Sequence, residues 1–134
     1  MTEAANITGT GALCIALEGS ATHAAGESIG YIKNPEGAAI IVTDAVVYST
    51  VSSTGVANIT VGQGATVTAA HDTATIVAAA ALAAAAGTAI QGYDHADPAD
   101  SMVVVGASEY IVACASADSS GYAGRLYVTY VRAA

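Results

Sequence analysis

The stretch AIIVTDAVVYSTV, residues Ala39–Val51, decides the fold. It is rich in β-branched residues and carries a single charge, Asp44, which is typical of a strand. Strict alternation places large apolar side chains on both of its faces: Ile41, Val47 and Val51 on one, and Ile40, Val42, Val46 and Tyr48 on the other. A strand that is apolar on both faces is covered on both faces. We therefore expect one face to meet the core and the other to meet a partner subunit.

Turn signals lie on both sides of this strand. Asn34-Pro35-Glu36-Gly37 precedes it and Ser52-Ser53-Thr54-Gly55 follows it. The next segment, 56–62, alternates cleanly, with Ala57, Ile59 and Val61 expected to point inward. These two segments predict an antiparallel hairpin.

A second hairpin is predicted at the C-terminus. Asp118-Ser119-Ser120-Gly121 has favourable turn chemistry and separates the strand candidates 109–117 and 122–132. Alternation divides the last strand into two faces: Leu126, Val128 and Tyr130 on one, and Arg125, Tyr127, Thr129 and Val131 on the other.

The remaining segments complete a mainly β chain. Residues 28–33 and 102–105 read as short strands, and 11–17 as a strand that pairs elsewhere or as part of an arm. Residues 72–86 form either an Ala-rich helix or an irregular crossover. The pattern predicts an antiparallel β-sandwich or barrel with at most one short helix. We expect residues 1–25 to be an N-terminal arm or edge strand and residues 26–134 to be one sandwich domain.

Charge and composition narrow the possible partners. The chain has 134 residues, which suits one domain, and a net charge of -8 with only three Lys and Arg residues. So few cations exclude binding to many nucleic-acid phosphates or to an anionic membrane surface. Only 10% of the residues are charged, which favours a surface partly covered by other subunits. The first residues resemble no secretory signal, so we expect synthesis in a cytoplasm.

The residues that could carry chemistry favour no catalytic, cofactor or metal site. The acidic loop 94–100 lacks the ligand order of a calcium loop and is interpreted as a hydrated turn. No nucleophile motif accompanies the three histidines, so we interpret them as surface or capping residues. They are His23, His71 and His95. Cys14 and Cys114 are expected to be reduced thiols that are at least partly buried.

Two groups of segments resemble small head proteins of tailed bacteriophages. The first runs from Asn34-Pro35-Glu36-Gly37 through Ile40-Ile41-Val42-Thr43 to Ser52–Ala57 and Val61-Gly62. The second comprises Glu109–Val112, Ala115–Asp118, Gly121, Gly124 and Leu126–Val131. The resemblance covers about residues 28–132. The run Ala78–Ala86 departs from it, because a more polar segment is expected there.

The resemblance implies a jelly-roll-like sandwich that decorates or cements a capsid as a homotrimer. Its partners would be its own copies and the major capsid protein, on the virion surface, and no catalytic residue is carried over. The interface candidates are the outward strand positions and two residues of the arm: Val47, Val51, Tyr127, Val131, Ile7 and Leu13. The alternative is a head-fibre or tail module that binds a host glycan or receptor, with Tyr93 beside Asp94 and Asp97 as its platform.

Overall fold

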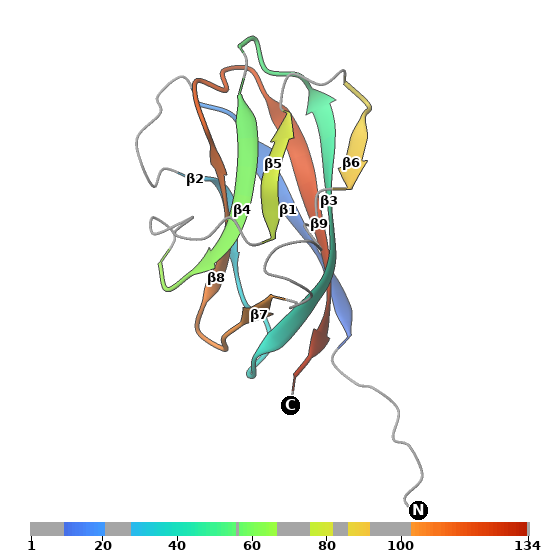
Figure 1. Ribbon diagram of the computed structural model, residues 1–134, viewed down its shortest axis with the longest axis vertical. Helices are drawn as coiled ribbons and strands as arrows, with labels where there is room; N and C mark the ends of the chain where they lie inside the picture. Colours follow the sequence, from blue (N-terminus) through green and yellow to red (C-terminus); the bar gives the residue numbers. More distant parts are fainter. Residues whose placement is uncertain are drawn as a thin grey trace, which may run out of the picture.

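Every regular element in the described part of the chain is a β-strand. The computed structural model describes residues 10–20, 28–55, 57–66, 76–81, 86–91 and 103–133. Its nine strands (Figure 1) are β1 (Gly11–Glu18), β2 (Ser28–Lys33), β3 (Ile40–Val51), β4 (Asn58–Gly64), β5 (Val77–Ala81), β6 (Ala89–Gln91), β7 (Val104–Val105), β8 (Tyr110–Ala115) and β9 (Ala123–Arg132).

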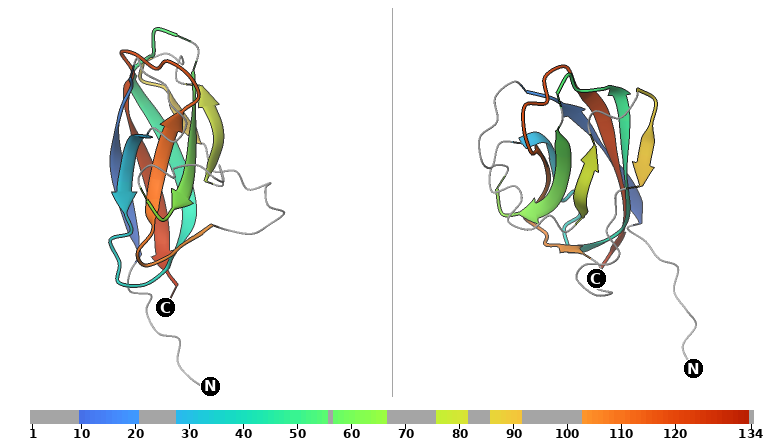
Figure 2. Two further views of the ribbon diagram at one scale, coloured as in Figure 1. Left: turned by 90° about the vertical axis from the view of Figure 1, so that its left-hand side faces the viewer. Right: turned by 45° about the horizontal axis from the view of Figure 1, so that its top comes forward.

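The strands form two antiparallel sheets that pack face to face (Figure 2). Sheet A has the order β1-β9-β3-β6, and the short β7 also pairs with β3. Sheet B has the order β2-β8-β4-β5. With β7 set aside, this is the strand order of a jelly roll, in which most consecutive strands lie on opposite sheets. The prediction of an antiparallel, jelly-roll-like sandwich is confirmed.

Neither of the two predicted hairpins forms, because their strands belong to different sheets. β3 lies in sheet A and β4 in sheet B, while β8 lies in sheet B and β9 in sheet A. The turn predicted at 118–121 is present. Asp118 Oδ1 accepts a hydrogen bond from Ser120 N at 2.9 Å, and Gly121 has a φ of 78°. The chain crosses between the sheets at this turn. The consecutive strands β4 and β5 do pair.

The predicted faces of β3 are wrong for Val46, Val47 and Tyr48. The pairing of β3 with β9 shifts register between Val42 and Asp44, so one extra residue interrupts the alternation. Ile40 and Val42 point into the core, and after the shift Ala45 and Val47 do so as well. Val46 and Tyr48 consequently lie on the outer face of sheet A. Val51 lies on the outer side with Ile41, as predicted, because a second register shift falls between Ser49 and Val51.

Alternation holds on the strands that carry no extra residue of their own at a register shift. On β9 the inward set is buried as predicted: Leu126, Val128 and Tyr130. Around β4 the predicted inward set is also buried: Ala57, Ile59 and Val61. β1 adds Leu13, Ile15 and Leu17 to the same core. The core lies between the two sheets, and Tyr122 is one of its largest fully buried side chains.

The helix considered for residues 72–86 is wrong over residues 77–81. These residues form β5, which pairs with β4, and Ile76 and Val77 are fully buried. Alanine favours a helix over most other residues by only a few tenths of a kcal/mol per residue. Pairing with a neighbouring strand overrides so small a preference. Residues 71–75 and 82–85 lie outside the described part. No helix in the described residues is long and apolar enough to cross a membrane.

Candidate functional site

The outer face of sheet A is a broad surface of small and apolar side chains. Register places Cys14 beside Tyr127 and Tyr127 beside Val46. The neighbouring row joins Ala16, Arg125 and Tyr48. Because β1, β9 and β3 are long and directly paired, these rows form one continuous face.

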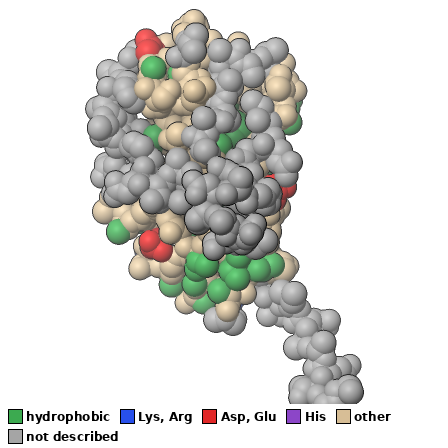
Figure 3. Space-filling view, viewed as in Figure 1, with side chains coloured by type: hydrophobic (Ala, Val, Ile, Leu, Met, Phe, Trp, Pro, Cys, Tyr) green, Lys and Arg blue, Asp and Glu red, His purple; other side chains and the backbone are tan. Residues whose placement is uncertain are grey.

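Several large apolar groups of sheet A are exposed. The exposed fraction is 40% for Tyr127, 50% for Val51 and 48% for Val104. Val131 and Val104 both pair with Ile41, so they extend the apolar face toward β7. Figure 3 shows hydrophobic side chains gathered at this end of the sandwich.

Charges on this face are few. Its strands carry Glu18, Asp44 and Arg125 among the outward positions, with Arg132 at the end of β9. The Thr43 and Thr129 hydroxyls form a hydrogen bond of 2.9 Å across β3 and β9, which satisfies two polar groups within the face. A face with few charges and internally paired hydroxyls is costly to leave in water and suited to packing against protein.

The structure separates the interface candidates. Val51 and Tyr127 are exposed and Val131 is half-buried, all on sheet A. Val47 and Leu13 are buried in the core of the chain, so their side chains are not on its surface. For Val47 the reason is the register shift in β3, and for Leu13 it is the inward alternation of β1. Ile7 lies outside the described residues, as do Tyr93, His23, His71, His95 and the acidic loop 94–100.

Sheet B has an apolar cluster that the sequence analysis missed. Val112 and Cys114 are buried on the face away from the core, with Tyr110 packed against them. The rings of Tyr110 and Tyr31 meet edge to face with centroids 6.3 Å apart. Tyr31 is 53% exposed, so it remains available to a partner.

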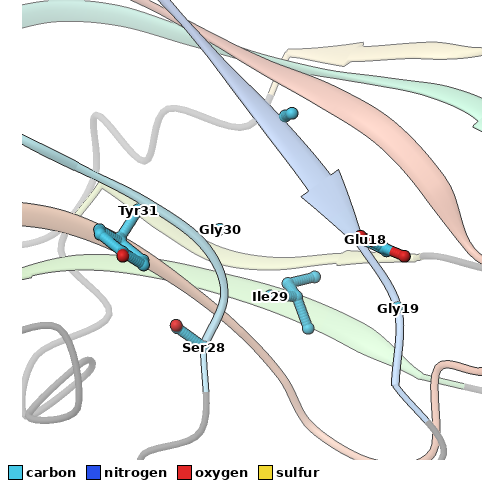
Figure 4. A pocket seen from close by; sticks show the side chains of 7 residues that line it. Glu18, Gly19, Ser28, Ile29, Gly30 and Tyr31 are labelled. Atoms are coloured by element: carbon cyan, nitrogen blue, oxygen red, sulfur yellow. The ribbon is translucent and has the colours of Figure 1, made fainter.

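The same analysis missed a groove between β1 and β2. It has a volume of about 380 Å³ and is lined by residues of both strands, among them Glu18, Ser28 and Tyr31 (Figure 4). A Cβ on Gly30 would lie 2.6 Å from the Ala16 carbonyl oxygen, so only glycine allows this approach of the two strands. The two strands are consecutive in the chain but belong to different sheets, and no pattern in the sequence predicts their contact.

The two cysteines have different surroundings. Both are free; Cys14 is exposed and Cys114 is buried, so the expectation of partial burial is confirmed for Cys114 and wrong for Cys14. Cys14 faces outward because it alternates with the buried Leu13 and Ile15. Burial raises the pKa of the Cys114 thiol from 9.0 to about 11.

Two tyrosine hydroxyls are also held in their neutral form. Burial raises the pKa of Tyr122, and a hydrogen bond with Ser49 offsets part of that rise. Burial is also the largest cause that raises the pKa of Tyr130, followed by the negative charge of Glu36. The Tyr130 hydroxyl donates to Glu36 Oε2 at 3.2 Å. Each hydroxyl therefore links a strand to a neighbouring turn: Ser49 of β3 to Tyr122, and Tyr130 of β9 to Glu36.

The sequence matches no protein-family model and no curated protein. The fold is similar to that of a chain in a solved structure, "Capsid of Ralstonia phage GP4". The TM-score is 0.59, the sequences are 16% identical, and the match covers 100% of this chain and 92% of that chain. The two chains therefore share a fold over nearly their whole lengths.

Proposed function

We propose that this chain is a non-catalytic structural protein of a bacteriophage virion that decorates and stabilises the outer surface of the capsid. The observation that carries the proposal is the match over the full chain to a protein in the capsid of Ralstonia phage GP4. The whole domain matches, so the likeness does not rest on a shared local motif.

The outer face of sheet A supports a role in assembly. Tyr127, Val51 and Val104 are exposed beside half-buried apolar neighbours. Only 10% of the chain is charged, so few groups oppose the burial of such a face. We propose that this face is covered by further copies of the chain in a homotrimer, because closed rotational symmetry is the usual way to cover such a surface.

The proposed second partner is the major capsid protein. A trimer that binds the assembled lattice and not its free subunits would stabilise the shell by mass action. Residues 1–25 are proposed to contribute to this contact through their first part, which precedes β1. The proposed location is the virion surface after synthesis in the host cytoplasm.

The test is binding of the purified chain to undecorated capsids built from the major capsid protein of the same virus. Native mass spectrometry is expected to give three times the chain mass of 13.0 kDa. Cosedimentation is expected to saturate, and saturated capsids are expected to melt at a higher temperature than bare ones. A monomer that binds no capsid at any concentration would overturn the proposal. Binding to host cells without binding to capsids would instead favour the head-fibre or tail module.

A further inference from the structure

The first residue of β1 lies directly against a tyrosine ring. Gly11 pairs with Tyr130 of β9, and alternation places both on the core side of sheet A, since Leu13 and Tyr130 are buried. A Cβ on Gly11 would lie 2.6 Å from the Tyr130 hydroxyl oxygen and 2.8 Å from its Cζ, so any larger residue would have to displace the ring. The ring therefore fills the place that an inward side chain at position 11 would take.

The turn between β2 and β3 holds this ring where it is. The Tyr130 hydroxyl donates to Glu36 Oε2 at 3.2 Å. The backbone of Glu36 is fixed in turn, because its N–H donates to Asn34 Oδ1 at 2.9 Å. Asn34 is buried and donates to two carbonyl oxygens at the end of β7. The ring cannot move away from Gly11 without losing its hydrogen bond to Glu36.

These contacts lie at the end of the sandwich where β1 begins and β9 ends (Figure 1). Residues 1–9, called the leading segment, are joined to the sandwich here through Thr10, which is exposed. Nine residues span at most about 30 Å when fully extended. The effective concentration of such a tether at a second site depends on its length and on where it is attached. The first pair of β1 and β9 sets both.

We propose that Gly11 and Tyr130 are positioning residues for the leading segment. The Tyr130 ring, held by Glu36, keeps the start of β1 paired and so fixes the point from which the segment reaches the capsid. The inference deepens the proposed function and rests on it, because the capsid contact of this segment is proposed there. If Gly11 were released, the tether would begin farther along β1, and capsid binding would have to supply the free energy of ordering the freed residues.

The other end of the same strand pair offers a matched control. Gly124 of β9 pairs with Leu17 of β1, and a Cβ on Gly124 would lie 2.9 Å from Cζ of Tyr122. The Tyr122 hydroxyl is hydrogen bonded to Ser49, as the Tyr130 hydroxyl is to Glu36. Each end thus has a glycine against a tyrosine ring whose hydroxyl has a partner. The leading segment is attached at one of these ends and not at the other.

The test uses Gly11→Ala and Tyr130→Phe at the end where the leading segment is attached. Gly124→Ala and Tyr122→Phe are the controls, and all four are made in the full chain and in a chain that lacks residues 2–9. Cosedimentation with undecorated capsids gives the dissociation constant, at a temperature where circular dichroism shows every variant to be folded. In the full chain Gly11→Ala is expected to weaken binding about fivefold or more, and Tyr130→Phe, which keeps the ring, about twofold or more.

The shortened chain provides the decisive measurement. Gly11→Ala and Tyr130→Phe are expected to have no effect there, because the segment that they position is gone. The controls are expected to leave the affinity unchanged in both chains, although they also remove core contacts.

Three outcomes would overturn this inference while the proposed function stands. The first is equal weakening, or none, by the substitutions at the two ends. The second is an effect of Gly11→Ala that persists in the shortened chain, and the third is a shortened chain that binds capsids as tightly as the full chain. A full wild-type chain that binds no capsid would remove both the inference and the proposed function.

Discussion

The hydroxyl of Tyr122 lies 3.1 Å from the hydroxyl of Ser49, and both residues are buried. Tyr122 precedes β9 and Ser49 lies near the end of β3, so the hydrogen bond joins the central pair of sheet A at one end. A Cβ on Gly124 would lie 2.6 Å from the Tyr48 carbonyl oxygen, so the backbones here are already as close as they can be. Two hydroxyls in this setting satisfy each other without water.

Tyr122→Phe is expected to lower the free energy of unfolding by about 1–3 kcal/mol, because the Ser49 hydroxyl stays buried without its partner. Urea unfolding measures the change. Adding Ser49→Ala to Tyr122→Phe is expected to recover part of the loss, since no orphan hydroxyl then remains. Strictly additive losses would show that the two hydroxyls do not interact.

Asn34 is expected to be a strong determinant of stability although it lies in a turn. Its Nδ2 donates to the carbonyl oxygens of Val105 and Gly106 at 3.1 and 2.9 Å, and its Oδ1 accepts from Glu36 N at 2.9 Å. Asn34→Ala is expected to cost about 1–3 kcal/mol in the free energy of unfolding. Gly37→Ala is the control from the same turn, because a Cβ there meets nothing within 4 Å.

The thiols are expected to react at very different rates. Cys14 is exposed, while Cys114 is buried and its raised pKa of about 11 leaves little thiolate at neutral pH. At a concentration where the folded chain is monomeric, a maleimide at pH 7 is expected to modify one thiol per chain, located at Cys14 by peptide mass spectrometry, and two after denaturation. Equal labelling of both thiols in the native chain would contradict the burial of Cys114.

Stability is expected to fall in alkaline solution. The folded chain holds the Cys114 proton to about pH 11, while the unfolded chain releases it near pH 9.0. This contribution to stability is therefore complete below pH 9 and is lost as the pH rises toward 11. The raised pKa values of Tyr122 and Tyr130 act in the same direction above pH 10. Cys114→Ala is expected to remove the part of the decline that begins near pH 9 in urea titrations.

Two substitutions on β3 are expected to have different effects, one on folding and the other on self-association. Val47→Asp places a charge in the core and is expected to lower the free energy of unfolding by more than about 4 kcal/mol. Val51 is exposed, so Val51→Asp is expected to leave the fold intact while it weakens self-association. Sedimentation and thermal melting distinguish the two outcomes. A Val47→Asp variant that folds as a stable monomer would contradict the assignment of Val47 to the core.

Much of the fold could be predicted from the alternation of apolar and polar residues along the strands. The wrong predictions concern features that this alternation does not determine. The buried set of β9 was predictable because the extra residues at its register shifts lie on β3, so alternation along β9 itself is unbroken. The bounds of β2 were predictable from its alternation and the turn signal after it, although its register shifts between Ser28 and Gly30. The sheet to which each strand belongs could not be predicted. Both sheets of a sandwich bury one face, so their strands have the same alternating pattern in the sequence. The two expected hairpins failed for this reason.

The candidate surface was predictable in part. Tyr127 and Val131 were assigned correctly to the outward side of β9. Val47 was not, because the extra residue between Val42 and Asp44 has no signature in a run of β-branched residues. The groove was missed because it depends on Gly30 and Ala16, which meet only after the two sheets have closed.

The pairing of the first strand with the last has a consequence for synthesis on the ribosome. Gly11 pairs with Tyr130, so β1 has no partner in sheet A until β9 has left the exit tunnel. Leu13, Ile15 and Leu17 emerge before the eight later strands, and their strand has no partner in sheet A until β9 follows. Long-range pairing of this kind delays folding and leaves apolar strands open to aggregation while they wait. Slow translation near the C-terminus or depletion of nascent-chain chaperones should therefore reduce the soluble yield of this protein, even though its finished sandwich protects every one of these side chains.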